Sequence, residues 1–320
     1  MTAAETAAET AAETVAETVA ETVAETVAGD RLWQWRQQSR QAAIAHQIDP
    51  AEVDWLLHHA AGVEPLLLKL GPPADRAIAL RRSLADLTQL WTERLHARTP
   101  VQYLVGSVPW REFDLAVSPA VLIPRPETEL LIDLALAAAA QQGLSTHLPH
   151  HWADLGTGSG AIALGLATAF PTATVHAVDA SGDAAAIARQ NAEATGLTSR
   201  IQFYQGSWFE PLSRLAGQLQ GIVSNPPYIP TCDLASLDPE VAQHEPPAAL
   251  DGGPDGLDCI RHIARSAPHY LQPGGILLLE MMAGQAAAVT QILAATEEYA
   301  EIQIYPDLAG IERFALGALK

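Results

Sequence analysis

The chain has few cysteines and no long hydrophobic run. Its 320 residues include two cysteines, Cys232 and Cys259, which form neither a disulfide framework nor a paired metal-binding motif. We therefore expect a reducing, cytoplasmic compartment and no metal site. The longest apolar helical stretches, such as residues 130–140, are too short to span a bilayer. The N-terminus also lacks the basic start of a secretory signal, so we expect no membrane association.

Basic residues are scarce as well. The chain has 18 Lys and Arg against 37 Asp and Glu, a net charge of −19, and only two of the basic residues are lysines. Nucleic-acid binding relies on a basic face that releases counterions, so direct contact with DNA or RNA is disfavoured. A basic protein surface is the more natural partner for such an acidic chain.

Residues 2–29 are a repeat of Ala-Ala-Glu-Thr and then Val-Ala-Glu-Thr. In a helix, this four-residue period would bring like-charged glutamates together, and the β-branched residues would add a small cost. We predict that residues 1–29 form a disordered tail, with a weakly helical arm or a docking segment as the alternative.

Residues 30–99 show a helical pattern of apolar residues. The pattern includes Leu32, Trp35, Ile44, Val53, Leu56, Leu57, Ile78, Leu80, Leu84, Leu87, Leu90 and Trp91, and Asp49 followed by Pro50 is typical of a helix start. We predict a small helical bundle here. Its role is open between substrate recognition and stability of the fold. Residues 100–320 are long enough for one α/β domain.

A glycine turn, Asp-Leu-Gly-Thr-Gly-Ser-Gly, occupies residues 154–160. It lies between a short strand at 152–155 and an apolar helix at 161–170, and a second strand at 174–178 ends at Asp179. A dinucleotide-binding dehydrogenase would place its third glycine one residue later. Asp179 could accept both ribose hydroxyls of an adenosyl cofactor. The alternative is that Asp179 caps a helix, although Ser181 could serve that purpose.

A strand-like run at residues 221–224 leads into Asn225, Pro226, Pro227 and Tyr228. The lone pair of an amide or aromatic amine nitrogen is delocalised, which makes it a poor nucleophile. The Asn225 side-chain oxygen and a backbone carbonyl could accept both N–H bonds of an NH2 group, and a following proline has no N–H to compete. The tyrosine ring could lie against the substrate. Together with the glycine turn, this pattern indicates methyl transfer from S-adenosylmethionine to a planar nitrogen. It disfavours the alternative of a proline-rich turn with only a structural role.

Between the predicted bundle and the glycine turn, alternation at residues 113–117 predicts a hairpin. Pro126 with Glu127 and Glu129 indicates a helix start, since acids suit the N-terminal dipole. Arg125, placed between two prolines, has no such simple structural explanation.

Taken together, these motifs make the chain resemble the peptide chain release factor glutamine methyltransferases, from about residue 31 to the C-terminus. The segments that carry the resemblance are Gln-Tyr-Leu at 102–104, Leu-Ile-Pro-Arg-Pro-Glu-Thr-Glu at 122–129, the glycine turn at 154–160, Ser-Asn-Pro-Pro-Tyr-Ile at 224–229, Glu-Pro at 245–246 with Ala-Leu at 249–250, and Gly-Gly at 252–253 with Asp-Gly-Leu at 255–257. The Asn-Pro-Pro-Tyr tetrad alone also occurs in adenine amino-methyltransferases, whereas the combination is specific.

The resemblance implies an α/β fold with a seven-stranded, mostly parallel sheet whose last strand, at residues 313–319, is antiparallel. It implies S-adenosylmethionine as cofactor and class 1 release factors as protein substrates, methylated at N5 of the glutamine in their Gly-Gly-Gln loop. It also implies site residues. The cofactor would be lined by Gly156, Thr157, Gly158, Ser159 and Gly160, with Asp179 at its ribose and Trp208 at its adenine. The glutamine would be held by Asn225, Pro226, Pro227 and Tyr228. Asn225 would also lie near the cofactor, and Asn225 and Pro226 would act in catalysis.

One position departs from the family pattern, because Met282 stands where a turn glycine is usual. This puts the local geometry in question. Three alternatives stay open: an adenine amino-methyltransferase acting on DNA or RNA, a ribosomal-protein glutamine methyltransferase, and a binding module without turnover. We expect a monomer.

Overall fold

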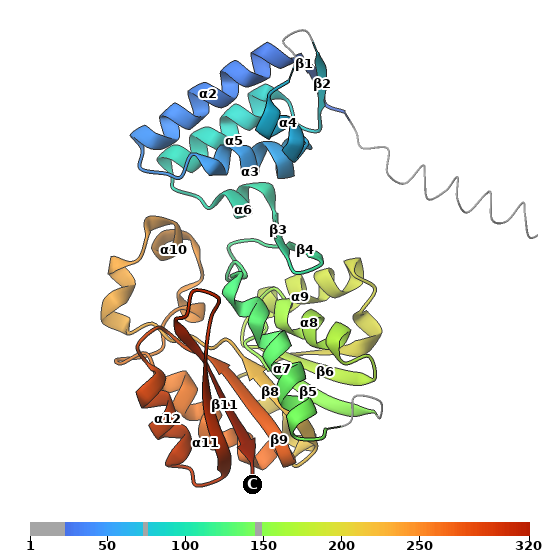
Figure 1. The fold of residues 1–320 in the computed structure, drawn as a ribbon, viewed down its shortest axis with the longest axis vertical. Coiled ribbons are helices and arrows are strands. Elements are labelled where there is room, and N and C mark those ends of the chain that lie inside the picture. The colour runs from blue at the N-terminus through green and yellow to red at the C-terminus, as the bar shows by residue number, and fades with distance from the viewer. Residues whose placement is uncertain (1–22, 73–75, 145–148) are drawn as a thin grey trace, which may run out of the picture. The chain divides into compact units, whose positions relative to one another are not determined.

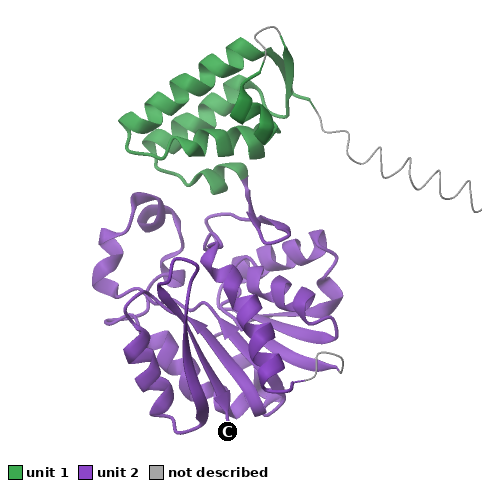
Figure 2. Ribbon diagram, in the orientation of Figure 1, with its two compact units in different colours: residues 1–105 green, residues 106–320 purple. Residues whose placement is uncertain are grey.

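The computed structural model describes residues 23–72, 76–144 and 149–320. The chain divides into two compact units, residues 1–105 and residues 106–320 (Figure 2). The boundary lies six residues after the one expected at 99, because the short helix α6 (Val101–Val105) belongs to the first unit. Within the described residues, no helix combines the length and hydrophobicity needed to cross a membrane.

The N-terminal unit is a helical bundle, as predicted. Besides α6 it contains α2 (Gly29–Ala45), α3 (Ala51–Ala61), α4 (Pro65–Leu70) and α5 (Leu84–His96). Fully buried residues such as Leu32, Leu56 and Leu87 form its core. At the start of α3, the Ala51 N–H donates to Asp49 Oδ1 at 2.8 Å, which agrees with the capping role expected of Asp49.

The structure corrects the expected end of the disordered tail. Residues Glu25–Ala28 form a strand, β1, which pairs antiparallel with β2 (Ala77–Leu80). Val27 is 3% exposed within the bundle core, and the Glu25 carboxylate accepts from the Leu84 N–H at 2.8 Å. Ile78 and Leu80, which we assigned to a helical pattern, therefore lie in a strand. The pairing with a distant segment outweighs the local preferences of the repeat. The rest of the predicted tail, residues 1–22, lies outside the described residues.

The C-terminal unit contains a seven-stranded sheet in the order β10-β11-β9-β8-β5-β6-β7 (Figure 1). The strands are β5 (His150–Leu155), β6 (Ala173–Asp179), β7 (Ile201–Gln205), β8 (Leu219–Ser224), β9 (Leu271–Glu280), β10 (Tyr299–Pro306) and β11 (Glu312–Leu319). Strands β5 to β9 pair in parallel, and β11 runs antiparallel to both β9 and β10. This confirms the predicted fold and its antiparallel last strand. The predicted hairpin is also present, as β3 (Ser107–Trp110) paired with β4 (Phe113–Ala116).

Helices cover both faces of this sheet. On one face lie α7 (Leu130–Gln141), α8 (Ala161–Ala169) and α9 (Gly182–Ala194), and on the other α11 (Asp258–Tyr270) and α12 (Ala286–Ala294) (Figure 1). A shorter helix, α10 (Pro239–His244), follows β8, and 3-10 turns lie at Glu127–Glu129, Thr198–Arg200, Glu210–Leu215, Thr231–Ser236 and Pro247–Ala249. A parallel sheet covered on both faces explains why β8 is buried along its whole length.

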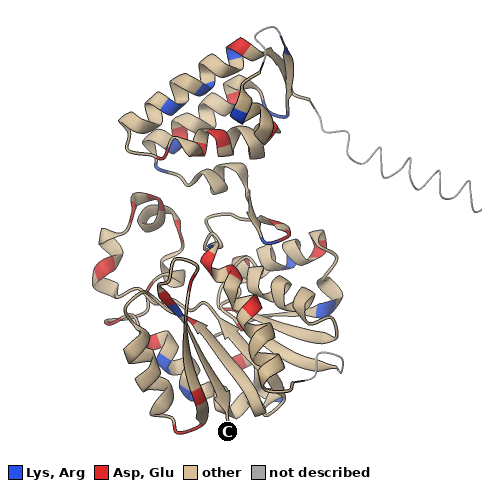
Figure 3. Cartoon of the chain, in the orientation of Figure 1, with Lys and Arg blue, Asp and Glu red and all other residues tan. Residues whose placement is uncertain are grey.

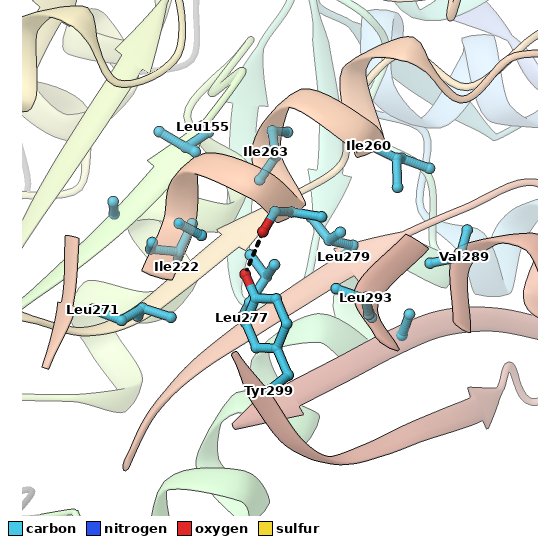
Figure 4. Packing of buried hydrophobic residues seen from close by; sticks show 14 of the residues in the cluster. Leu155, Ile222, Ile260, Ile263, Leu271, Leu277, Leu279, Val289, Leu293 and Tyr299 are labelled. Atoms are coloured by element: carbon cyan, nitrogen blue, oxygen red, sulfur yellow. Dashed lines mark hydrogen bonds between the residues drawn. The ribbon is translucent and has the colours of Figure 1, made fainter. Parts of the chain in front are cut away.

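The core under α11 and α12 is apolar. At its centre, the Tyr299 hydroxyl donates to the Ala264 carbonyl at 2.8 Å, which satisfies the polar end of an otherwise buried ring (Figure 4). Each fully buried Leu or Ile contributes about 1.5–3 kcal/mol to folding. Figure 4 labels the residues Leu155, Ile222, Leu271, Leu277 and Leu279 of the sheet and Ile260, Ile263, Val289 and Leu293 of the helices.

The direction of the strands positions the site. Strands β5, β6, β7 and β8 are parallel neighbours, so their carboxyl ends meet at one edge of the sheet. The glycine turn follows β5, Asp179 ends β6, Trp208 follows β7 and Asn225 follows β8. Ligands of open α/β sheets bind at this edge. Segments that are far apart in the chain are thereby brought together.

Candidate active site

The glycine turn after β5 is held by a buried carboxylate. The Thr157 hydroxyl donates to Asp154 Oδ2 at 2.6 Å, and the Ala163 N–H donates to the same oxygen at 3.0 Å. Burial raises the pKa of Asp154 to about 7, although both hydrogen bonds act to lower it. Gly156 and Gly158 have φ of 74° and 53°, which L side chains rarely adopt. The turn therefore depends on the glycines and on the residues behind it.

The five turn residues fall into two groups. Gly156 and Gly158 line a cavity at the sheet edge, so their bare backbone can approach a ligand. Thr157 and Ser159 are buried, and the Thr157 hydroxyl points away from the cavity to its carboxylate partner. A Cβ on Gly160 would lie 3.2 Å from a backbone atom of α9, so this glycine allows close packing of two helices. A direct cofactor contact is therefore best supported for Gly156 and Gly158.

Asp179 lies at the tip of β6 and lines the cavity. Its Oδ2 accepts the Gly158 N–H at 2.9 Å and its Oδ1 accepts the Ser181 N–H at 2.9 Å. A carboxylate has about four acceptor sites, so it can accept further bonds from a ligand. The cap of α9 is Ser181, whose hydroxyl accepts the Ala184 N–H at 3.2 Å. The alternative in which Asp179 caps this helix is therefore wrong.

Trp208 follows β7 and contributes to the cavity wall. Its φ of 50° is unusual for a bulky residue and turns the chain sharply after the strand. A Cβ on Gly156 would lie 3.8 Å from the Trp208 ring, so the ring stands beside the glycine turn. An aromatic face next to the carboxylate of Asp179 suits the adenine and ribose of an adenosyl group.

The Asn-Pro-Pro-Tyr tetrad begins where β8 ends. The Ser224 hydroxyl donates to the Leu155 carbonyl at 2.6 Å, which ties this strand end to β5. Asn225 and Pro227 line the cavity. Asn225 Nδ2 donates to Thr128 Oγ1 at 3.2 Å. The Tyr228 hydroxyl donates to Glu280 Oε1 at 3.2 Å, and burial together with Glu280 raises the pKa of this tyrosine.

Thr128 and Glu280 were not identified from the sequence. Thr128 donates to Glu280 Oε2 at 2.8 Å, and these two residues are 4% and 2% exposed. Burial raises the pKa of Glu280 to about 7, against the lowering effect of its hydrogen bonds. One signal was available, since Glu280 ends an apolar strand and a carboxylate in such a place needs a partner. Thr128 lies between the two acids that we assigned to a helix start, and nothing in its sequence neighbourhood indicated a role in the site.

Arg125 pairs with Glu245 close in sequence to residues that line the cavity. Its Nη2 lies 2.8 Å from both carboxylate oxygens, and Glu245 is 3% exposed. Burial raises the pKa of Glu245, and Arg125 opposes this shift. Leu122 and Pro246, which belong to the segments of Arg125 and Glu245, both line the cavity, so the ion pair joins two segments that contribute to its wall. This gives Arg125 the structural explanation that the sequence did not provide.

The cavity has a volume of about 200 Å³ and mainly apolar walls with few polar groups. Such walls with a small number of placed polar groups are typical of small-molecule sites. Among the described residues, no group of three or more His, Cys, Asp and Glu side chains is placed to hold a metal ion.

Known proteins resemble this chain over most of its length. A relative from Synechocystis sp., named release factor glutamine methyltransferase, is 51% identical over 287 residues, 90% of this chain and 96% of its own. A relative of the same name from Thermosynechococcus vestitus is 46% identical over 291 residues, 89% of this chain and 96% of its own. The chain belongs to the release factor glutamine methyltransferase family. Residues 134–236 also match the model of the Methyltransferase small domain.

Among solved structures, the catalytic domain of hMettl16 in complex with a 3'UTR hairpin matches with a TM-score of 0.52 and 11% identity. It covers 77% of this chain and 85% of the other, and it supports the fold alone. The family's usual glycine is Met282 here. Met282 has no left-handed backbone, and its N–H donates to Gln285 Oε1 at 3.0 Å. The turn therefore forms without the glycine.

The cavity fits the cofactor of a methyltransferase of this family, S-adenosylmethionine. Gly156 and Gly158 present backbone where side chains would narrow the space. Asp179 supplies a carboxylate for hydroxyl groups, and Trp208 supplies an aromatic face. Asn225 and Pro227 lie on the same cavity, so the tetrad is within reach of a bound cofactor.

Proposed function

We propose that this protein methylates N5 of the glutamine in the Gly-Gly-Gln loop of class 1 translation release factors, with S-adenosylmethionine as methyl donor. The observation that carries this proposal is the 51% identity over 90% of the chain to a release factor glutamine methyltransferase. The geometry agrees with it, because Asn225 and Pro227 of the tetrad line the same cavity as Gly156 and Gly158 of the glycine turn.

The chain's own residues hold and orient both substrates. Gly156, Gly158, Asp179 and Trp208 hold the cofactor, which supplies an electrophilic sulfonium methyl group. The Asn225 side-chain oxygen and the Pro226 carbonyl accept the two N–H bonds of the glutamine amide. Pro227 has no N–H that could compete for that carbonyl.

Orientation accounts for most of the catalysis in this scheme. Correct placement of reacting atoms can supply roughly 7–11 kcal/mol of a barrier. Asn225 also stabilises the positive charge that develops on the nitrogen, an interaction strongest in the transition state. No strong base is needed before attack, because the nitrogen's proton becomes acidic only after the methyl arrives.

The alternatives have less support. An adenine amino-methyltransferase needs a basic groove, whereas Figure 3 shows the Lys and Arg residues of the C-terminal unit interspersed with Asp and Glu. The similar relatives described above are named for release factors and not for ribosomal proteins. A binding module without turnover would have no need of Asn225 beside the cavity.

We propose further that the helical unit recognises the release factor, and that the protein works as a cytoplasmic monomer without direct contact to nucleic acid. The acidic net charge supports the lack of contact with nucleic acid, and the two free cysteines support a reducing compartment. Light scattering of the full chain tests the monomer, and a second copy in solution would overturn it.

The activity is tested by mass spectrometry of a release factor incubated with the protein and S-adenosylmethionine. We expect a gain of one methyl group on the glutamine of the Gly-Gly-Gln loop. The control is the same release factor with that glutamine replaced by alanine. Methylation of both versions at equal rates, or of neither, would contradict the proposal.

A further inference from the structure

A chain of hydrogen bonds runs behind the tetrad and away from the cavity. Asn225 Nδ2 lies 3.2 Å from Thr128 Oγ1, and that hydroxyl lies 2.8 Å from Glu280 Oε2. The other carboxylate oxygen accepts from the Tyr228 hydroxyl at 3.2 Å. Thr128 comes from the 3-10 turn before α7 and Glu280 from the end of β9. Three separate segments are thus joined at one buried carboxylate.

The chain has a direction, which is set by what each group can donate. An ionised carboxylate only accepts, so the single hydroxyl proton of Thr128 must be given to Glu280. Towards Asn225, Thr128 can then present only a lone pair. That lone pair accepts from Nδ2 and leaves Oδ1 of the amide free. The reverse orientation would place two acceptors against each other.

We propose that Thr128 and Glu280 are positioning residues that fix the orientation of the Asn225 amide, so that its oxygen faces the substrate nitrogen. This inference rests on the proposed function. It assigns a task to two residues that touch neither substrate nor cofactor directly. Tyr228, the fourth group of the chain, is held by the same carboxylate, so one buried acid orients both ends of the tetrad.

The ionisable groups around Glu280 come from several elements. Glu127, which precedes α7, acts to raise the pKa of Glu280, whereas Arg313 on β11 and the hydroxyls of Thr128 and Tyr228 act to lower it. Arg125, which lies before the 3-10 turn, acts on the neighbouring Tyr228. Arg313 is paired with Asp307 at 2.8 Å, and Arg125 with Glu245. Burial is the largest influence and raises the pKa of Glu280 to about 7. Once protonated, this group becomes a donor at one oxygen and can reverse the chain.

The test uses the full-length protein with Thr128→Val, Thr128→Ser and Glu280→Gln. Valine keeps the shape of threonine but not its hydroxyl. We expect Thr128→Val to lower kcat by about 10- to 100-fold, since small misplacements of reacting groups can have effects of this size. The KM for S-adenosylmethionine should stay within about twofold. Thr128→Ser keeps the hydroxyl and should restore most of the rate.

Glu280→Gln offers one oxygen acceptor to two donors, so one contact must reverse, and we expect kcat to fall by about tenfold. The kcat of the unaltered protein should fall as the pH drops below about 7, and this fall should be smaller in the variant, because glutamine does not titrate whereas Asp154 still does. Thr290→Val is the matched control. It removes a hydroxyl bond of 2.8 Å to the Ala286 carbonyl in α12, and kcat should not change.

A readout independent of turnover is hydrogen exchange of the Asn225 carboxamide protons, followed by NMR with labelled asparagine. Exchange should be faster in Thr128→Val than in the unaltered protein and the Thr290→Val control. Equal exchange, or full activity of Thr128→Val, would overturn the positioning proposal. If the unaltered protein itself failed to methylate a release factor, the proposed function would fall instead, and the exchange experiment would still report on the amide.

Discussion

The two sides of the cavity are built in different ways. On the glycine-turn side, Gly156, Gly158 and Asp179 come from two neighbouring strand ends, and their contacts are mostly to backbone groups close in the fold. On the tetrad side, Asn225 is anchored by the side chain of Thr128, which is 97 residues upstream, and through Thr128 by Glu280. The glycine-turn side is thus held by local contacts, whereas the tetrad side depends on contacts between segments that are far apart in the sequence.

This difference shows how much of the site a sequence can reveal. A turn whose conformation requires glycine leaves a visible pattern, because few residues can replace it. A side chain that orients a residue of a distant segment leaves no recognisable pattern in the sequence around it. The cofactor side should therefore tolerate changes in remote segments, whereas the tetrad side should not.

The largest effect that we expect is on the tetrad side. Asn225→Ala removes the acceptor that orients the amide and stabilises its developing charge, so single-turnover methyl transfer should fall by about 10²- to 10³-fold. Binding of S-adenosylmethionine, measured by calorimetry, should change far less. Asn225→Asp retains an acceptor and should keep more activity than Asn225→Ala. A fully active Asn225→Ala protein would remove Asn225 from the mechanism.

On the cofactor side, we expect substitutions to weaken cofactor binding. Asp179→Ala should weaken S-adenosylmethionine binding by about 1.5–3 kcal/mol, because hydrogen bonds to a charged group are lost. Asp183→Ala is the control, since Asp183 lies in the first turn of α9 and does not line the cavity. Asp179 also accepts from the Gly158 N–H, so circular dichroism is needed to show that the variant keeps the overall fold. Equal affinities for the two variants would place the ribose elsewhere.

The predictions made from sequence succeeded where local patterns decide. The order of strand, glycine turn, helix and strand was correct, because residues 150–179 alternate between apolar runs and a turn that only glycine allows. The parallel sheet and antiparallel last strand came from the family resemblance. Thr128 and Glu280 were missed because each belongs to a segment whose neighbours already explained it. Their importance appears only when β8 and β9 place their ends side by side.

The N-terminal repeat provides the same contrast between local pattern and distant contact. Val23 and Val27 occupy equivalent places in the repeat, yet Val23 is 54% exposed and Val27 is 3% exposed because β1 pairs with β2. Val27→Ala removes two buried methyl groups and should lower the free energy of unfolding by about 1.5 kcal/mol. Val23→Ala should have almost no effect. Urea unfolding of both variants is the measurement, and equal stabilities would mean that β1 contributes nothing to the bundle.

The smallest effect should come from the ion pair of Arg125 and Glu245, which joins two segments of the cavity wall. Arg125→Ala leaves the buried Glu245 carboxylate unpaired, but Arg125 itself is 36% exposed, so solvent screening limits the loss to about 1 kcal/mol. The pKa of Glu245 is already raised by burial, and removing the arginine that opposes this shift raises it further. A folded state with a raised pKa binds the proton more tightly than the unfolded chain. The stability that Glu245 contributes is therefore lost as the pH rises from 4.5, the ordinary pKa of a glutamate, through its pKa in the folded state. Arg125→Ala should therefore lower the free energy of unfolding, measured with urea, by more at pH 8 than at pH 5. Arg111→Ala breaks a more exposed pair with Asp133 and should show no such difference. If the two variants had the same pH dependence, the buried carboxylate of Glu245 would not be what makes this pair matter.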